Sequence, residues 1–228
     1  FCPQGGDRYF TDRGLRWSEM MATTHALVGL AVAAGAATVV PEITTPAILA
    51  AAAGGVFPDL DLYAGHRQTL HYPVYFGMLA VPAVLVALLV GSALAWAGAL
   101  FLVGAALHSI MDAAGGGLEL RPWRGTSDRA VYSHYHGRWI APRRWIRYDG
   151  APEDLALGAV AALPGVLTFD GHLATGLLAL VAISAGYALV RKPMVSAAEW
   201  LLERVPAGLQ ERLPDRFLEE SVGGDTKP

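Results

Sequence analysis

Long uncharged, apolar segments alternate with charged loops along this chain. Segment 72–111 is forty residues without Asp, Glu, Lys or Arg, and Gly91-Ser92 divides it into two spans of about twenty residues, the length that crosses a bilayer. Four further segments of this kind are 26–40, 43–57, 155–169 and 173–190. None carries the polar stripe of a helix in a soluble bundle, so a soluble bundle is the weaker alternative. The pattern predicts an all-α, multi-pass transmembrane helical bundle of about six helices.

The positive charges fall on one side of this predicted bundle. If all six segments cross the membrane, the 17 Lys and Arg residues lie in the N-terminal stretch, in loop 58–71, in a long cytoplasmic loop over 112–154 and in the C-terminal tail. The three short turns on the other side carry none. Because Lys and Arg accumulate in the cytoplasmic loops of membrane proteins, the sequence predicts a cell-membrane protein with both termini in the cytoplasm.

The two ends of the chain differ from its apolar part. Met20-Met21 directly precedes the first apolar segment, which leaves open that residues 1–20 are a polar leader of non-native origin. Residues 21–192 form the transmembrane domain, and the candidate metal site falls within it. In residues 193–228 apolar and charged positions first mix and then give way to polar ones, which predicts an amphipathic to disordered cytoplasmic tail.

Composition excludes several classes of protein. Hydrophobic residues make up 54% of the chain and charged residues only 16%, which argues against a disordered chain and an ordinary cytosolic enzyme. A net charge of −3 gives no basic field for a polyanion, so membrane lipid is the expected partner and nucleic acid is not. The single cysteine excludes an internal disulfide and a thiolate metal cluster.

The first candidate for chemistry is the sequence His108-Ser-Ile-Met-Asp112, at the end of the forty-residue apolar run. Residues four apart lie on one face of a helix, so this imidazole and carboxylate can share a divalent cation. A hydrogen bond at the end of a helix is the simpler alternative. Because ionisable groups beside apolar segments are costly, their presence here favours a functional role.

Two more candidate motifs lie in the loop after the second apolar segment. Phe57-Pro-Asp59-Leu-Asp61 places two carboxylates after a helix, and an extended chain, which Pro58 favours, would point both to the same side. A solvated loop with a helix cap is the alternative. His66 and His71 follow in Gly65-His-Arg-Gln-Thr-Leu-His71, where each is a candidate ligand or base, or a histidine at the membrane interface without a role.

The predicted topology brings these residues to the cytoplasmic ends of four helices. Imidazole and carboxylate ligands suit divalent ions, with zinc expected, and the set is large enough for one or two ions with positions left for water. The predicted ligands are His25, Asp59, Asp61, His71, His108 and Asp112. Asp61 and His66 are the predicted catalytic residues, with His66 as ligand or base.

The order of these motifs resembles the YdjM-type family of membrane-bound predicted metal-dependent hydrolases, which are also described as LexA-binding and inner-membrane-associated. The motifs that carry the resemblance are Thr24-His25, Phe57 to Asp61, Gly65 to His71, His108 to Asp112, and Gly116 to Trp123. Leu70-His71-Tyr72 departs from the pattern, where a small polar residue is expected after the histidine. The resemblance implies a hydrolase and names no substrate.

The long loop combines arginine with tryptophan, as segments in the lipid headgroup layer do. Positive-inside charge alone explains this composition, and arginine also binds phosphate in a bidentate manner. We expect Arg67, Arg121 and Arg124 to bind an anionic substrate.

Two functions fit these observations. The favoured one is a membrane-embedded, metal-dependent hydrolase that acts at the cytoplasmic interface on a phosphoester or lipid-linked substrate. The alternative is a metal-binding membrane transporter or a non-enzymatic membrane scaffold. Transport would call for ionisable residues near the middle of the membrane, whereas these lie at the helix ends.

Overall fold

The computed structural model describes residues 20–40, 43–63, 65–119, 121–202 and 204, and the predicted leader and most of the predicted tail lie outside these residues. The described part is mostly helical, as predicted. Its six α-helices are α1 (Ala22–Ala37), α2 (Thr45–Val56), α3 (Tyr75–Val90), α4 (Ala93–Ala114), α5 (Pro152–Thr168) and α6 (Gly171–Leu202). The expected turn at Gly91-Ser92 separates α3 from α4.

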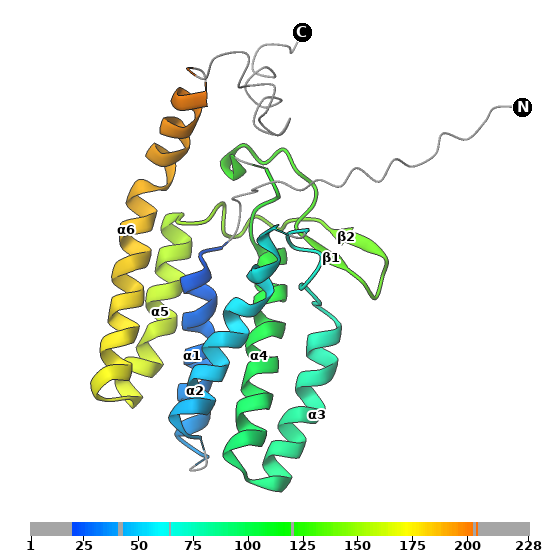
Figure 1. Cartoon of the computed structure of the whole chain (residues 1–228), viewed down its shortest axis with the longest axis vertical. Helices are drawn as coiled ribbons and strands as arrows, with labels where there is room; N and C mark the ends of the chain where they lie inside the picture. The colour runs from blue at the N-terminus through cyan, green and yellow to red at the C-terminus, as the bar shows by residue number, and fades with distance from the viewer. Residues whose placement is uncertain (1–19, 41–42, 64, 120, 203, 205–228) are drawn as a thin grey trace, which may run out of the picture.

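The helices form a bundle in which each packs on its spatial neighbours in the order α3, α4, α2, α1, α5 and α6 (Figure 1). The short connections between α1 and α2, α3 and α4, and α5 and α6 lie at one end. The longer segments lie at the other end, which we call the loop end: residues 57–74 and 115–151. All four predicted functional motifs that follow α1 therefore meet at the loop end.

Two adjacent glycines allow the central helices to approach closely. A Cβ atom at Gly54 of α2 would clash with the backbone carbonyl of Phe101 in α4. A Cβ atom at Gly55 would lie 2.5 Å from the carbonyl oxygen of His25 in α1. Only glycine therefore fits at both positions, and this pair brings α1 and α4 against adjacent faces of α2, as small residues do between membrane helices.

The aspartate motif adopts a conformation different from the predicted one. Residues Phe57–Tyr63 form a 3₁₀ helix, η1, that continues directly from α2, so the extended chain expected around Asp59 and Asp61 is wrong. Pro58 is compatible with this because its fixed φ suits a helical turn, and the carbonyl of Gly55, three residues earlier, accepts from His108 instead of from a backbone N–H at residue 58. Side chains two apart in a 3₁₀ helix point in different directions, so the two carboxylates have different surroundings.

A small β-hairpin, which the sequence did not predict, covers part of the loop end. Strands β1 (Val131–Ser133) and β2 (Arg138–Ile140) pair antiparallel with Val131 opposite Ile140. The backbone N–H of Tyr132 donates to the carbonyl of Arg67 at 2.9 Å. The hairpin therefore fixes the loop that carries His66 and His71. A 3₁₀ turn, η2 (Pro122–Arg124), precedes it.

Two described helices, α4 and α6, are long and apolar enough to cross a membrane, and α1 and α3 are shorter apolar helices. In the most apolar stretch of α6 only 11% is buried inside the bundle, whereas 44% of the corresponding stretch of α4 is buried. Residues 193–202, expected to begin a separate amphipathic tail, continue α6 without a break. The outer helices thus present apolar side chains outward, such as Leu89 (87% exposed) and Leu189 (79%).

Candidate metal centre

Four side chains from three segments converge at the loop end of the bundle: Asp59, His71, His108 and Asp112. Asp59 comes from η1, His71 from the loop before α3, and the other two from successive turns of α4. We call these four residues the His/Asp group. Three of its side chains are completely buried, whereas Asp59 is 11% exposed. Asp59 is thus the least buried of the four, although both of its carboxylate oxygens are buried.

The donor atoms of the His/Asp group are spaced as ligands of one ion. His71 Nε2 lies 3.1 Å from His108 Nε2 and 3.0 Å from Asp112 Oδ2. His108 Nε2 lies 3.3 Å from the same Asp112 oxygen and 3.2 Å from Asp59 Oδ1, and His71 Nε2 lies 3.9 Å from that Asp59 oxygen. Ligands at tetrahedral positions around zinc lie about 3.3–3.6 Å from one another, given bond lengths near 2.0–2.2 Å. The group could therefore hold a metal ion.

In His71 and His108, the hydrogen-bond partner of Nδ1 shows that this nitrogen carries a hydrogen. His108 Nδ1 lies 2.6 Å from the carbonyl oxygen of Gly55, which only accepts, so Nδ1 carries the hydrogen and donates it. His71 Nδ1 donates to Asp61 Oδ2 at 3.1 Å in the same way. Where the imidazoles are neutral, each Nε2 presents a lone pair toward the carboxylate oxygens of Asp59 or Asp112. Such electron-rich atoms at contact distance repel one another unless a metal ion or a proton lies between them.

Asp61 acts on the histidines rather than within the group of four. Its Oδ1 accepts from His66 Nδ1 at 3.0 Å, and its Oδ2 accepts from His71 and from the N–H of Leu70 at 2.9 Å. Burial by itself would raise the pKa of Asp61, but the hydrogen bonds from His66 and His71 outweigh it and hold the pKa well below its usual range. Asp61 therefore stays ionised and orients both rings.

Arg67 supplies the positive charge nearest to the group. Its side chain is completely buried, its Nε lies 3.5 Å from Asp112 Oδ2, and its Nη1 donates to the carbonyl of Gly116 at 2.9 Å. Its backbone has φ of 57°, a left-handed conformation that a residue with a Cβ adopts at a cost of about 1–3 kcal/mol. The hairpin and Asp61, which accepts the N–H of Arg67 at 3.3 Å, hold it there.

The buried charges of this region fit a divalent cation. In the His/Asp group together with its two bonded neighbours, Asp61 and Arg67, three carboxylates and one guanidinium sum to −2 when the imidazoles are neutral. Because an uncompensated buried charge is costly, a divalent cation would stabilise this arrangement. Imidazole ligands are typical of sites for transition-series ions, whereas Mg²⁺ and Ca²⁺ prefer oxygen ligands.

The other predicted site residues have varied positions. His25 lies against the group, with its ring centroid 3.8 Å from that of His108. His66 is buried one residue before Arg67 and bonds Asp61. Arg121 and Arg124 lie beside and within η2, where Arg124 is exposed, and their role in substrate binding stays a prediction.

Sequence reasoning missed two contributors to this site. The Gly55 carbonyl fixes the tautomer of His108, and a backbone atom leaves no signal in a sequence beyond the Gly54-Gly55 pair itself. Asp154, at the start of α5, is buried and accepts the N–H of Met21 at 2.8 Å, which anchors the start of α1 one turn before His25. An acidic residue directly before an apolar segment was the available signal.

Comparisons with family models, curated proteins and solved structures found no match to this chain. Any functional conclusion therefore depends on the geometry of the site.

Proposed function

We propose that this chain is a multi-pass membrane protein and a metal-dependent hydrolase that acts at the cytoplasmic membrane interface on a phosphoester. The observation that carries the proposal is the His/Asp group itself: four converging donors, with the Nδ1 of each histidine bonded so that its Nε2 faces the group. The set contains no cysteine, unlike the usual structural zinc sites, and a fifth position on the ion would admit water.

Zinc is the proposed ion, and bound there it would act as a Lewis acid that activates water and stabilises charge on a phosphoryl group. The chain's own residues would divide the remaining work. Asp61 keeps His71 oriented, and the buried guanidinium of Arg67 holds an anionic substrate beside Asp112. His66, held at Nδ1 by Asp61, is the proposed proton acceptor.

The motifs that resemble the YdjM-type family support this proposal, and membership of that family is part of it. Each of the five motifs contributes a group to this region. The contributions are His25, Asp59, His71, the His108–Asp112 pair and the Gly116 carbonyl that accepts from Arg67.

A cavity of about 250 Å³ at the same end of the bundle supports a lipid-linked substrate. Its lining comes from the start of α1, from Leu62 next to Asp61, from Asp149, and from Ile183 and Tyr187 of α6, and it is mostly apolar. An acyl or polyprenyl chain would fit such a surface better than a polar metabolite would.

The test combines metal analysis with hydrolysis of a phosphoester panel by the full chain in detergent or lipid. His108→Ala should weaken metal affinity by at least about 10–100-fold and abolish hydrolysis. His172→Ala, at the start of α6 and at the opposite end of the bundle, is the matched control and should bind metal and hydrolyse substrate as the unmodified chain does. Asp59→Asn keeps the shape of the side chain and should also abolish hydrolysis.

Metal binding without hydrolysis of any phosphoester would overturn the enzymatic proposal and leave the transporter or scaffold. Equal metal content in His108→Ala and His172→Ala would remove the His/Asp group from the function altogether.

A further inference from the structure

The two carboxylates of the His/Asp group each have a second oxygen that the first ion does not explain. Asp112 directs Oδ2 toward His71 and His108, and Asp59 directs Oδ1 toward His108. Asp112 Oδ1 and Asp59 Oδ2 are buried, and neither has a hydrogen bond to any described residue. Buried carboxylate oxygens are costly without a partner, so these two atoms need one.

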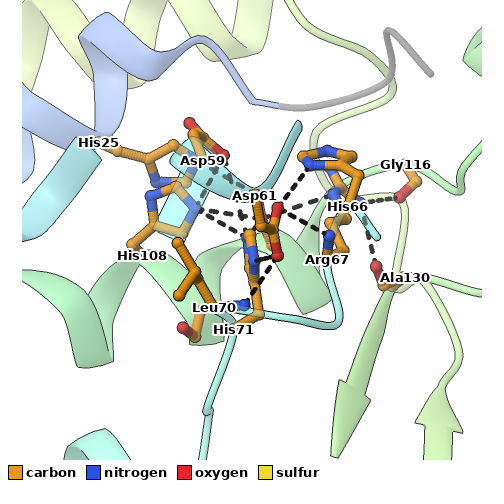
Figure 2. Close-up of polar contacts among 12 residues, drawn as sticks. His25, Asp59, Asp61, His66, Arg67, Leu70, His71, His108, Gly116 and Ala130 are labelled. Carbon is orange, nitrogen blue, oxygen red and sulfur yellow. Dashed lines mark hydrogen bonds and ion pairs between the residues drawn. The ribbon is translucent and has the colours of Figure 1, made fainter. Parts of the chain in front are cut away.

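The ring nitrogens of His25 also lack hydrogen-bond partners among the described residues. Its side chain is completely buried, and neither ring nitrogen has a hydrogen bond in acceptable geometry among the described residues. Its Nε2 nevertheless lies 3.2 Å from Asp112 Oδ1. Figure 2 shows the His25 ring beside that of His108, with the Asp59 carboxylate next to both. An imidazole nitrogen and a carboxylate oxygen at this distance form an ion pair when the imidazole is protonated, and they can serve as two ligands of a common ion when it is neutral.

We propose a second divalent cation site formed by His25 Nε2, Asp112 Oδ1 and Asp59 Oδ2. Asp112 and Asp59 would bridge the two ions, and each carboxylate would give one of its oxygens to each ion. This inference rests on the proposed function to the extent that the first ion occupies the His/Asp group. Bridged pairs of this kind, with ions about 3.5–4 Å apart, stabilise both the attacking and the leaving oxygen in phosphoester hydrolysis.

The charges then identify the class of substrate. One divalent ion neutralises the buried charge of −2, and a second leaves the region at +2. A phosphoester with one or two negative charges would offset this excess, and a neutral ester or amide would not. The second ion therefore makes the site selective for phosphomonoesters and phosphodiesters.

The test measures ions per chain in the full-length protein in detergent, with Zn²⁺ for stoichiometry and Mn²⁺ for electron paramagnetic resonance. The unmodified chain should bind two ions, and two Mn²⁺ ions that share carboxylates should give an exchange-coupled spectrum. His25→Ala should bind one ion and give the spectrum of isolated Mn²⁺. His134→Ala, whose ring bonds the carbonyl of Gln68, is the matched control and should keep two coupled ions.

One Zn²⁺ per chain at saturation in the unmodified protein would overturn the second site, and this measurement does not depend on whether His25→Ala folds. Two ions that persist uncoupled in His25→Ala would also overturn it, because the second ion would then lie elsewhere. One ion together with phosphoester hydrolysis would refute this inference and keep the proposed function. Two coupled ions without hydrolysis would keep this inference and refute the proposed function. A chain that binds no metal would refute both.

Discussion

Single hydrogen bonds decide which residues of this site could bind a metal ion and which would orient its ligands. Asp61 and the Gly55 carbonyl each accept an imidazole Nδ1–H and thereby aim Nε2 at the centre of the group. Such partners set the orientation and basicity of the ligand, so their loss weakens metal binding although they never touch the ion. The two neighbouring aspartates differ in this way: Asp59 is a candidate ligand, whereas Asp61 orients a ligand.

Asp61→Asn should lower metal affinity by about 10–100-fold. The amide keeps the size of the side chain, but it offers one acceptor oxygen where the carboxylate offers two, so His66 and His71 cannot both be held. Affinity is measured by competition with a chelating dye. Asp128→Asn, an exposed aspartate before the hairpin, is the control and should not change it. An unaltered affinity in Asp61→Asn would show that His71 needs no orienting partner.

At the scale of elements, the site depends on how closely α1, α2 and α4 approach. Gly54 and Gly55 permit contacts that any Cβ would prevent, and the same stretch of α2 leads into η1 and Asp59. Helix packing and ligand geometry are therefore coupled through two glycines. The short hairpin adds a second constraint through its bond to the Arg67 carbonyl.

Gly55→Ala should destabilise the protein by about 1–3 kcal/mol, because the new methyl group would meet the backbone carbonyl of His25, which cannot move without moving α1. Metal affinity should fall with it. Gly35→Ala is the control, since a Cβ there meets nothing within 4 Å. It should leave stability unchanged or raise it by about 0.5–1 kcal/mol through better helix propensity. Thermal unfolding in detergent measures both. Equal melting temperatures for the two variants would contradict the close contact.

The start of α5 gives a prediction for pH. The guanidinium of Arg147 donates to Glu153 at 2.6 Å and lowers the pKa of that carboxyl from 4.5 to about 2. A lowered pKa in the folded state stabilises the protein above about pH 4.5, and this contribution is lost as the pH falls toward about 2. Because Arg147 is 62% exposed, the effect is small.

The Glu153→Gln variant should accordingly have a lower melting temperature than the unmodified protein at pH 7. This difference in melting temperature should shrink as the pH falls below about 4.5. The control is the same substitution in an Arg147→Gln background, where this pH-dependent difference should disappear. A difference that is constant across the range would assign the effect to packing instead of charge.

At the scale of the whole molecule, the surface and the charges support the proposed orientation. Apolar side chains face outward along α3 and α6, and in the sequence none of the 17 Lys and Arg residues falls in the three short turns. Exposed apolar surface of this extent is unfavourable in water and is typical of lipid-facing helices. With the proposed topology, the loop end and its His/Asp group face the cytoplasm.

Two exposed aspartates at opposite ends of the bundle test this orientation. With Cys2 replaced by serine, Asp170→Cys in the turn between α5 and α6 should react with a membrane-impermeant thiol reagent added to intact cells. Asp128→Cys, at the loop end, should react only after the membrane is opened. Labelling of Asp128→Cys in intact cells would invert the topology and move the metal centre to the outer side.

The sequence by itself determined the helical elements and the end of the bundle at which chemistry gathers. Apolar runs bounded by turns such as Gly91-Ser92 fix helices locally, because hydrophobic spacing and chain length act within one segment. It also identified every member of the His/Asp group, since His and Asp beside long apolar segments are too costly to be incidental.

Only the tertiary structure decided the role of each of these residues. Asp59 and Asp61 are equivalent in sequence, yet a 3₁₀ turn sends one carboxylate to His108 and the other to His66 and His71. Likewise, the sequence identifies Arg67 only as an arginine in a loop. In the structure it is held by the hairpin and by the carbonyl of Gly116. Side-chain direction and burial arise from contacts between segments distant in the chain, and neither composition nor spacing within a segment carries that information.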